Sequence, residues 1–314
     1  MSSMKILNGL DGLKQLPPRS VLSIGNFDGV HLGHRRIIST AQSYAANTSP
    51  VALVTFEPHP LTVLHPNNVP PRLTPLSIKN ELLANAGIDY LVELPPTQEI
   101  LNTTAEDFFA ILRDHVRPSH MIEGENFNFG KARQGTIHKL REWTASTDIQ
   151  LHVIDPVSAT LCDYTIAPVS SSLIRWLLSN GRVRDASRCL GRPYTLEGVV
   201  IPGFQRGRTI GTPTANLKLT SPQLLPPDAV YAAQCTVAGT TYPTAVSLGN
   251  LPTLGANLPH QLEAHLIGFT GDLYGQTLRV DLLDYLREQY KLPSLNHLKL
   301  QIARDLRTTA ALYT

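Results

Sequence analysis

The sequence predicts a protein of two domains, an α/β domain built on a parallel sheet followed by an antiparallel β-barrel that a helix closes. Two patterns lead to this fold class. In the first half, short apolar segments alternate with helical segments, as they do in parallel sheets. Past about Gly191 the apolar segments are short and separated by Gly and Pro, which is typical of antiparallel barrels. A length of 314 residues fits two domains, which we expect at residues 1–186 and 187–314.

The elements of the first half follow from runs of apolar residues and from helix-capping residues. The segment Val51–Phe56 is apolar without alternation, which suits a strand that is buried on both faces. Thr104 is a good N-cap, and the acidic residues after it favour the first turn of a helix. We expect strands at residues 21–24, 51–56, 88–94, 120–122 and 151–154, and helices at residues 31–46, at residues 77–86 and after Thr104.

The elements of the second half are shorter and lie closer together. We expect strands at residues 198–201, 229–232, 261–267 and 277–283. A helix over residues 294–311 follows, with Ser294 in a position to cap it. Turn residues between the strands favour antiparallel pairing.

Composition and charge exclude several classes of function. Lys and Arg number 27 against 25 Asp and Glu, so a net charge of +2 gives no electrostatic footprint for nucleic acid. No apolar run approaches the roughly 18 residues of a membrane span, and the N-terminus lacks the apolar core of a secretory signal. Cys162, Cys189 and Cys235 fit neither a disulfide framework nor a zinc site. We therefore expect a cytoplasmic protein that binds neither nucleic acid nor membranes.

The most informative segment of the first half, Gly25-Asn26-Phe27-Asp28-Gly29-Val30-His31-Leu32-Gly33-His34, follows the first of these expected strands and opens the helix after it. Ligands of parallel sheets bind at this edge, and the N–H groups of a helix start attract phosphate. His31 and His34 lie on one face of the first turn, where they can donate hydrogen bonds to phosphate oxygens. Taken alone, such a pair is equally typical of a metal site or of two surface histidines.

In this context, the segment resembles the nucleotidyltransferases, and Asn26, Phe27 and Asp28 make it similar to the bacterial bifunctional riboflavin kinase/FMN adenylyltransferases in particular. Further similar segments are residues 55–60, 124–130 and 170–175. The resemblance implies a Rossmann-like nucleotidyltransferase domain that adenylylates FMN to FAD. The implied ATP contacts are Gly25, Asn26, Phe27, Asp28, His31, Gly33, His34, Ser171, Ser172 and Arg175, and the implied flavin contacts are Asn126 and Phe127.

The most informative segment of the second half runs from Gly203 to Asn216 and contains Pro213-Thr214-Ala215-Asn216. Its glycines and its proline are also compatible with ordinary hairpin turns. The segment resembles the riboflavin kinase signature, which implies ATP contacts from Gly203, Gly207, Arg208, Gly211, Thr214 and Asn216. The same resemblance implies that Thr214 and Asn216 bind the Mg²⁺ of MgATP, an ion that prefers oxygen ligands.

The resemblance assigns two further residues of the second half. Glu263 corresponds to the catalytic base that accepts the proton of the ribityl hydroxyl, and Arg287 corresponds to a residue on the flavin side. Riboflavin, FMN and ATP are then the small-molecule partners, FMN and FAD are substrate and product and not prosthetic groups, and a homo-oligomer is compatible with the family. The chain departs from the family pattern at Thr212, Ala229, Leu254 and Leu292, which puts its flavin affinity in question.

Two other functions stay open at this point. One is an FMN adenylyltransferase whose barrel binds flavin without phosphorylating it, against which Glu263, Thr214 and Asn216 speak together. The other is a different nucleotidyltransferase, such as one for pantetheine phosphate, fused to an interaction barrel. Conversion of riboflavin and MgATP to FMN and FAD distinguishes the three.

Overall fold

The computed structural model describes residues 4–203, 212–249 and 261–313 of the chain. The chain forms two compact units, one of Met1–Pro70 with Leu76–Ser158 and one of Pro71–Pro75 with Ala159–Thr314. Each unit is described by itself. A helix pair that precedes the barrel, α8 (Ser171–Ser179) and α9 (Val183–Leu190), belongs to the second unit, and a functional boundary at residues 186/187 stays a prediction.

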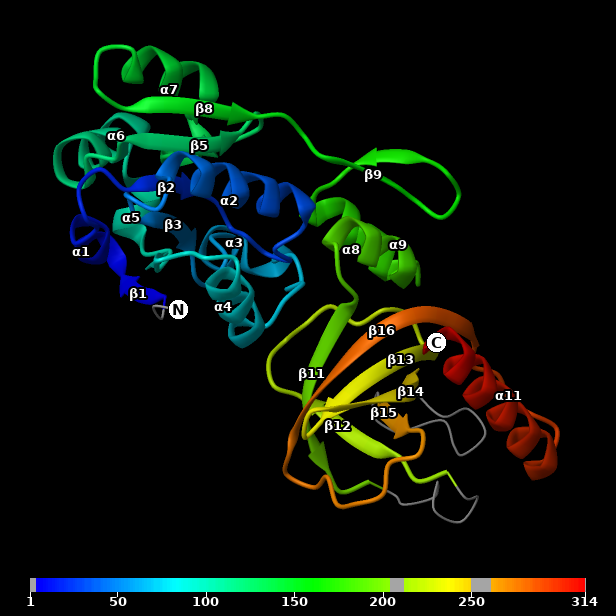
Figure 1. The fold of residues 1–314 in the computed structure, drawn as a ribbon. Coiled ribbons are helices and arrows are strands. Elements are labelled where there is room, and N and C mark those ends of the chain that lie inside the picture. Colours follow the sequence, from blue (N-terminus) through cyan, green and yellow to red (C-terminus); the bar gives the residue numbers. More distant parts are fainter. Residues whose placement is uncertain (1–3, 204–211, 250–260, 314) are drawn as a thin grey trace. The chain divides into compact units, whose positions relative to one another are not determined.

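The first unit is built on a six-stranded sheet in which all neighbouring strands are parallel (Figure 1). The order is β1-β4-β3-β2-β5-β8. The strands are β1 (Lys5–Asn8), β2 (Val21–Ile24), β3 (Val51–Phe56), β4 (Tyr90–Leu94), β5 (His120–Gly124) and β8 (Gln150–Ile154). The predicted parallel α/β domain is confirmed, although the sequence did not predict β1, an edge strand whose residues are mostly exposed.

Helices cover both faces of this sheet, because successive strand residues point to opposite sides. Leu22 and Val54 belong to a core with α1, α6 and α7, whereas Val21 and Leu53 belong to a second core with α2 and α4. The helices are α1 (Gly9–Lys14), α2 (Leu32–Ala45), α3 (Leu61–Leu64), α4 (Leu76–Asn85), α5 (Gln98–Asn102), α6 (Ala105–Ile111) and α7 (Ile137–Thr144), and a small hairpin of β6 (Asn128–Phe129) and β7 (Gly135–Thr136) follows β5.

Side chains that accept backbone N–H groups set the starts of these helices. Thr104 caps α6 as predicted, since its hydroxyl accepts the Asp107 amide at 3.0 Å. The prediction that the helix after β2 includes His31 is wrong by one residue. His31 has an extended backbone and is the N-cap of α2, because its Nδ1 accepts the His34 amide at 3.3 Å.

The second unit contains a closed antiparallel barrel with the strand order β11-β12-β15-β14-β13-β16 (Figure 1). The strands are β11 (Tyr194–Ile201), β12 (Ala215–Leu219), β13 (Ala229–Val237), β14 (Thr240–Gly249), β15 (Gln261–Leu266) and β16 (Thr277–Glu288). Fully buried side chains such as Leu196, Tyr231, Val246 and Leu282 belong to its strands, and α11 (Leu295–Tyr313) packs on β13 and β14. The predicted barrel with a closing helix is confirmed.

Strand β14 was not predicted, because Pro243 lies within it and proline is normally a signal against a strand. The pairing with β15 ends at Thr244, one residue after Pro243. The proline therefore sits just outside that ladder, and its carbonyl still accepts the Ile267 amide at 2.8 Å.

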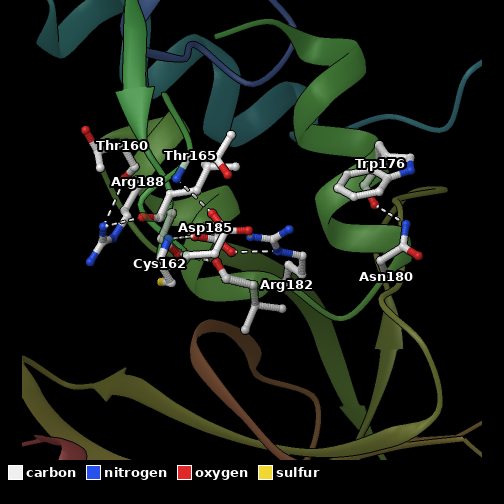
Figure 2. A network of polar contacts seen from close by, with 12 residues as sticks. Thr160, Cys162, Thr165, Trp176, Asn180, Arg182, Asp185 and Arg188 are labelled. Carbon is white, nitrogen blue, oxygen red and sulfur yellow. Dashed lines mark hydrogen bonds and ion pairs between the residues drawn. The ribbon is translucent and has the colours of Figure 1, made fainter. Parts of the chain in front are cut away.

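A polar network joins α9 to the short hairpin of β9 (Ser158–Thr160) and β10 (Ile166–Pro168) (Figure 2). Its centre is Asp185, which is 4% exposed and accepts the Cys162 amide at 2.5 Å and the Arg182 guanidinium at 2.7 Å. Arg182 also reaches Asp163 at 2.8 Å. The Cys162 amide and the Arg182 guanidinium together compensate the cost of burying the Asp185 carboxylate.

We predict that Asp185→Ala lowers the free energy of unfolding by roughly 2–4 kcal/mol, because a buried amide and a guanidinium lose their common acceptor. Thermal unfolding followed by circular dichroism measures the effect. Asp114→Ala is the matched control, since Asp114 pairs with Arg113 on the exposed surface, and its midpoint should match that of the wild type. Equal midpoints for Asp185→Ala and the wild type would show that the network is dispensable.

Candidate functional site

The first candidate site lies where the strand order of the sheet in the first unit reverses, between β2 and β5. β3 and β4 lie on one side of β2, and β5 and β8 lie on the other. β2 pairs with β3 along its whole length but with β5 only at Val21 and Leu22. The loops after β2 and β5 leave the sheet at the same edge, and such a switch point is where open parallel sheets bind ligands.

Glu123 of β5 occupies the place where the ladder between β2 and β5 stops. Its Oε1 accepts the Ile24 amide at 3.0 Å, so a side chain satisfies a donor beyond the last backbone pair. Glu123 is 1% exposed, and burial raises its pKa well above the ordinary value, opposed only in part by the Ile24 amide. Sequence reasoning missed this residue, since a single glutamate in a strand usually faces solvent.

Two buried apolar residues of the loop after β2, Phe27 and Val30, adopt an unfavourable backbone conformation. Phe27 and Val30 have positive φ angles of 48° and 41°, and each is only 1% exposed. A positive φ is unfavourable for a β-branched residue such as valine and marks backbone that its surroundings hold in place. Phe27 therefore lies in the core, and its ring packs beside Gly25, whose amide donates to the Val54 carbonyl at 2.9 Å.

His31 and His34 are brought together as the sequence predicted for one face of a helix start. Their rings are stacked with centroids 3.6 Å apart and planes 17° apart. Because Nδ1 of His31 accepts the His34 amide, the proton of neutral His31 lies on Nε2. Burial first, then His31 and Lys79, lower the pKa of His34 well below 6.5, so the His34 ring stacks on His31 as a neutral imidazole.

The His34 ring carries a buried polar atom. Its Nδ1 has no hydrogen-bond partner among the residues that the structure describes. A buried and unsatisfied ring nitrogen is costly in a core and is more common at a site that acts on a ligand. Phe27 lies beside the same ring, with centroids 5.2 Å apart.

Asn26 is held by contacts to Thr55 of β3 and to His59, which follows that strand. Thr55 Oγ1 donates to the Asn26 carbonyl at 3.1 Å, and the Asn26 amide group lies 3.3 Å from Nε2 of His59. Lys79 donates to Thr55 Oγ1 at 3.1 Å from α4. Sequence reasoning matched residues 55–60 to the site but missed Lys79, because its partner Thr55 lies 24 positions away in the sequence.

The predicted flavin residues Asn126 and Phe127 follow β5 at the same edge of the sheet. Asn126 is exposed in the turn, and its carbonyl accepts the Asn128 side chain at 2.7 Å. Phe127 is stacked on Phe129, with centroids 5.3 Å apart. Gly130 is required after them, because a Cβ there would lie 2.6 Å from the backbone of Ala105.

The predicted phosphate residues Ser171, Ser172 and Arg175 belong to the second unit. They lie in the first turns of α8, which Ser170 caps by accepting the Leu173 amide at 3.1 Å. Arg175 Nε donates to the Pro71 carbonyl at 2.8 Å within the same unit. A shared role of this helix start and the histidine pair stays a prediction.

The second candidate site lies on β12 and β15 of the barrel. Asn216 is paired with Glu263 in the register of these strands, and Thr214 Oγ1 lies 3.5 Å from Glu263 Oε2. Gly203 approaches closely, since a Cβ on it would lie 2.1 Å from Asn216 Nδ2. His265 Nδ1 contacts the Pro213 carbonyl at 2.6 Å and so fixes the segment that enters β12.

Four of the sequence-predicted positions in this half fall outside the described residues: Gly207, Arg208, Gly211 and Leu254. The other departures from the family pattern are described. Ala229 is fully buried at the start of β13, whereas Thr212 and Leu292 are partly exposed.

Arg287 has a well-defined structural partner in Asp305 of α11. Its Nε and Nη2 contact this carboxylate at 2.8–3.1 Å, and Asp305 is 7% exposed. The pair ties the end of β16 to the closing helix, so a flavin contact of Arg287 stays a prediction. Sequence reasoning missed Gln289, whose Nε2 donates to Ser247, the β14 residue paired with Glu263.

Two features are absent from the described residues, a cluster of metal-binding side chains and a membrane-spanning helix. No group of three or more His, Cys, Asp or Glu side chains there is arranged to hold a metal ion. No helix in the same residues has the length and apolar character needed to cross a membrane.

Comparisons with known proteins match both halves. A family model described as FAD synthetase matches residues 13–171, and one described as riboflavin kinase matches residues 190–313. The bifunctional riboflavin kinase/FMN adenylyltransferase of Escherichia coli K12 is 35% identical over 306 residues, which cover 96% of each chain. That of Bacillus subtilis is 32% identical and covers 93% of this chain and 92% of its own.

A solved structure extends the similarity to the fold of the whole chain. It is described as a macrolide-efflux protein from Streptococcus pneumoniae and aligns with a TM-score of 0.86 at 27% identity, covering 98% of both chains.

The raised pKa of Glu123 predicts a pH-dependent cost in stability. Above the ordinary value of 4.5, the unfolded chain releases this proton while the folded chain keeps it, so folding loses stability as the pH rises. Relative to the wild type, Glu123→Gln should gain up to about 1.4 kcal/mol per pH unit in that window. Urea unfolding at several pH values between 4.5 and neutrality measures the difference, and a difference that is independent of pH would contradict the prediction.

Proposed function

The chain belongs to the family of bifunctional riboflavin kinase/FMN adenylyltransferases, and from this premise we propose where in the molecule each reaction takes place. It is a riboflavin kinase and an FMN adenylyltransferase. The stacked His31–His34 pair at the switch point carries the proposal for adenylyl transfer, and the pairing of Asn216 with Glu263 carries it for phosphorylation.

In the adenylyl transfer, a phosphate oxygen of FMN attacks the α-phosphorus of ATP. The bond from that phosphorus to the bridging oxygen breaks, and pyrophosphate leaves. Negative charge builds on the oxygens around phosphorus, and preorganised N–H donors stabilise it. His31 supplies such a donor at Nε2, and His34 is the second member of the pair.

The other residues of this site bind and orient the two substrates. The backbone approaches the ATP phosphates at Gly25, Asn26 and Asp28 of the loop after β2 and at Gly33 in the first turn of α2. Phe27 anchors the loop from the core. Asn126 and Phe127 contact the flavin, and Ser171, Ser172 and Arg175 bind the triphosphate.

In the kinase reaction, the ribityl 5′-hydroxyl of riboflavin attacks the γ-phosphorus of a second ATP, and ADP leaves. Glu263 accepts the hydroxyl proton, because a carboxylate is the base that the site offers beside Thr214. The family resemblance also assigns Gly203, Gly207, Arg208 and Gly211 as contacts of this ATP, and Arg287 as a contact on the flavin side.

The donor atoms of the barrel site fit Mg²⁺. Thr214 Oγ1 and the side-chain oxygen of Asn216 are oxygen ligands at the start of β12, and the remaining positions suit phosphate oxygens and water. When bound with ATP, Mg²⁺ would neutralise phosphate charge, with Thr214 and Asn216 as its protein ligands. We place the protein in the cytoplasm, which its use of ATP and its three free cysteines support.

We predict that His34→Ala slows FAD formation from FMN by about 10²–10³-fold, the usual cost of removing one such donor. Riboflavin phosphorylation by the same preparation should stay near the wild-type rate. Chromatographic separation of the flavins after incubation with MgATP measures both reactions. His138→Ala, which removes an exposed histidine of α7, should leave both rates unchanged. Equal loss of both activities in His34→Ala would contradict the assignment.

We predict that Glu263→Gln lowers the rate of riboflavin phosphorylation by about 10²–10⁴-fold, because the amide keeps the size of the side chain but cannot accept the proton. MgATP binding, measured by calorimetry, and adenylylation of supplied FMN should persist. An unchanged rate of phosphorylation would show that Glu263 is not the base, and loss of MgATP binding would assign it to the nucleotide instead.

A further inference from the structure

Lys79 of α4 is a buried cation beneath the nucleotide loop of the first unit. It is 3% exposed, and neighbouring residues of its helix, such as Ile78 and Leu83, are buried apolar residues. Burial of an ammonium group is costly unless partners compensate, and apolar replacements of buried ion pairs are often neutral or stabilising. Stability alone therefore does not account for a lysine here.

The partners of Lys79 connect it to the loop that carries the histidines. Its Nζ donates to Thr55 Oγ1 at 3.1 Å and lies 3.6 Å from Glu57 Oε2. Thr55 is 1% exposed, and its single hydroxyl proton donates to the Asn26 carbonyl at 3.1 Å. Because Lys79 fills an acceptor position of that hydroxyl, it orients the proton toward Asn26.

The charge of Lys79 also acts on the pKa of His34. His34 is stacked on His31, and burial first, then His31 and Lys79, disfavour its protonation. Glu57, after β3, offsets part of the Lys79 charge at 3.6 Å. A neutral His34 can stay stacked on His31, whereas two imidazolium rings would repel one another.

We propose that Lys79 is a positioning residue for adenylyl transfer, which holds the Asn26 carbonyl through Thr55 and keeps the His31–His34 pair in its stacked arrangement. This inference rests on the proposed function of that pair. Lys79 acts through other residues: it sets the position of the loop and the charge state of His34. Misplacement of reacting groups by about 1 Å can cost on the order of 10²-fold in rate.

The test compares Lys79→Met and Thr55→Val in the full chain. Lys79→Met removes the charge and keeps most of the side-chain length, whereas Thr55→Val removes the bridging hydroxyl and keeps the ammonium. We expect Lys79→Met to lower kcat for FAD formation by about 10–10²-fold, with riboflavin phosphorylation within about twofold of the wild type. Thr55→Val should show a smaller loss of the same kind, and the double variant should lose little more than Lys79→Met, because both break one chain of contacts.

The pH profile separates the two roles of Lys79. Loss of the cation raises the pKa of His34, so the acidic limb of kcat/KM for FAD formation should move to higher pH in Lys79→Met. Thr55→Val keeps the cation, and its limb should coincide with that of the wild type. Lys139→Met is the matched control. Lys139 of α7 is 41% exposed and pairs with Glu106 of α6, so its replacement should change neither reaction.

Three results would overturn the inference: wild-type FAD formation by Lys79→Met, an equal loss of both reactions, or a raised KM for ATP at unchanged kcat with an unmoved limb. The last would assign Lys79 to direct phosphate contact. The wild-type assay separates the possible failures. A wild-type chain that forms no FAD overturns the proposed function and the inference with it, whereas an active wild type beside a fully active Lys79→Met overturns the inference alone.

Discussion

Both candidate sites depend on a backbone ladder that stops before its strands end. β2 and β5 are paired at Val21 and Leu22 only, and β12 and β15 are paired at Ala215 and Asn216 only. Backbone groups beyond such a point need other partners, and a substrate can supply them only where the protein has not already done so. The sheet and the barrel are unrelated architectures, yet each places its polar side chains where two strands part.

The two sites differ in how the parting strands are supported. In the sheet, Glu123 spans the gap and accepts the Ile24 amide, while Thr55 holds the Asn26 carbonyl two residues later. The start of the loop is thus fixed by two buried side chains, the acceptor Glu123 and the donor Thr55. In the barrel, His265 contacts the Pro213 carbonyl at 2.6 Å and so holds the segment that enters β12. Rigid support of this kind is what a site needs if its donors are to be in place before charge develops.

The sequence predicted most strands and helix starts, but it did not predict the buried polar residues that hold the loops of the site. Continuous apolar runs such as Val51–Phe56 identified buried strands, and Thr104 identified a helix start, because local chemistry decides both. β1, β12 and β14 were not predicted. β1 is an exposed edge strand, β12 begins within the Pro213–Asn216 motif, and β14 contains Pro243. Motif resemblance found the loop residues, but it could not find Glu123 or Lys79, whose importance comes from burial against segments distant in sequence.

The two reactions make different demands on their sites, and the residues differ accordingly. A ribityl hydroxyl is a poor nucleophile until its proton is removed, so phosphorylation calls for a base such as Glu263 beside the oxygens that suit Mg²⁺. The phosphate of FMN has already lost its protons near neutral pH, since the second pKa of a phosphate monoester is about 6, and adenylylation therefore needs donors for the charge that develops and no base for the attacking oxygen. The stacked histidine pair supplies N–H groups, and the lowered pKa of His34 keeps that ring neutral. The choice of carboxylate in the barrel and imidazoles at the sheet then follows from the protonation state in which each nucleophile arrives.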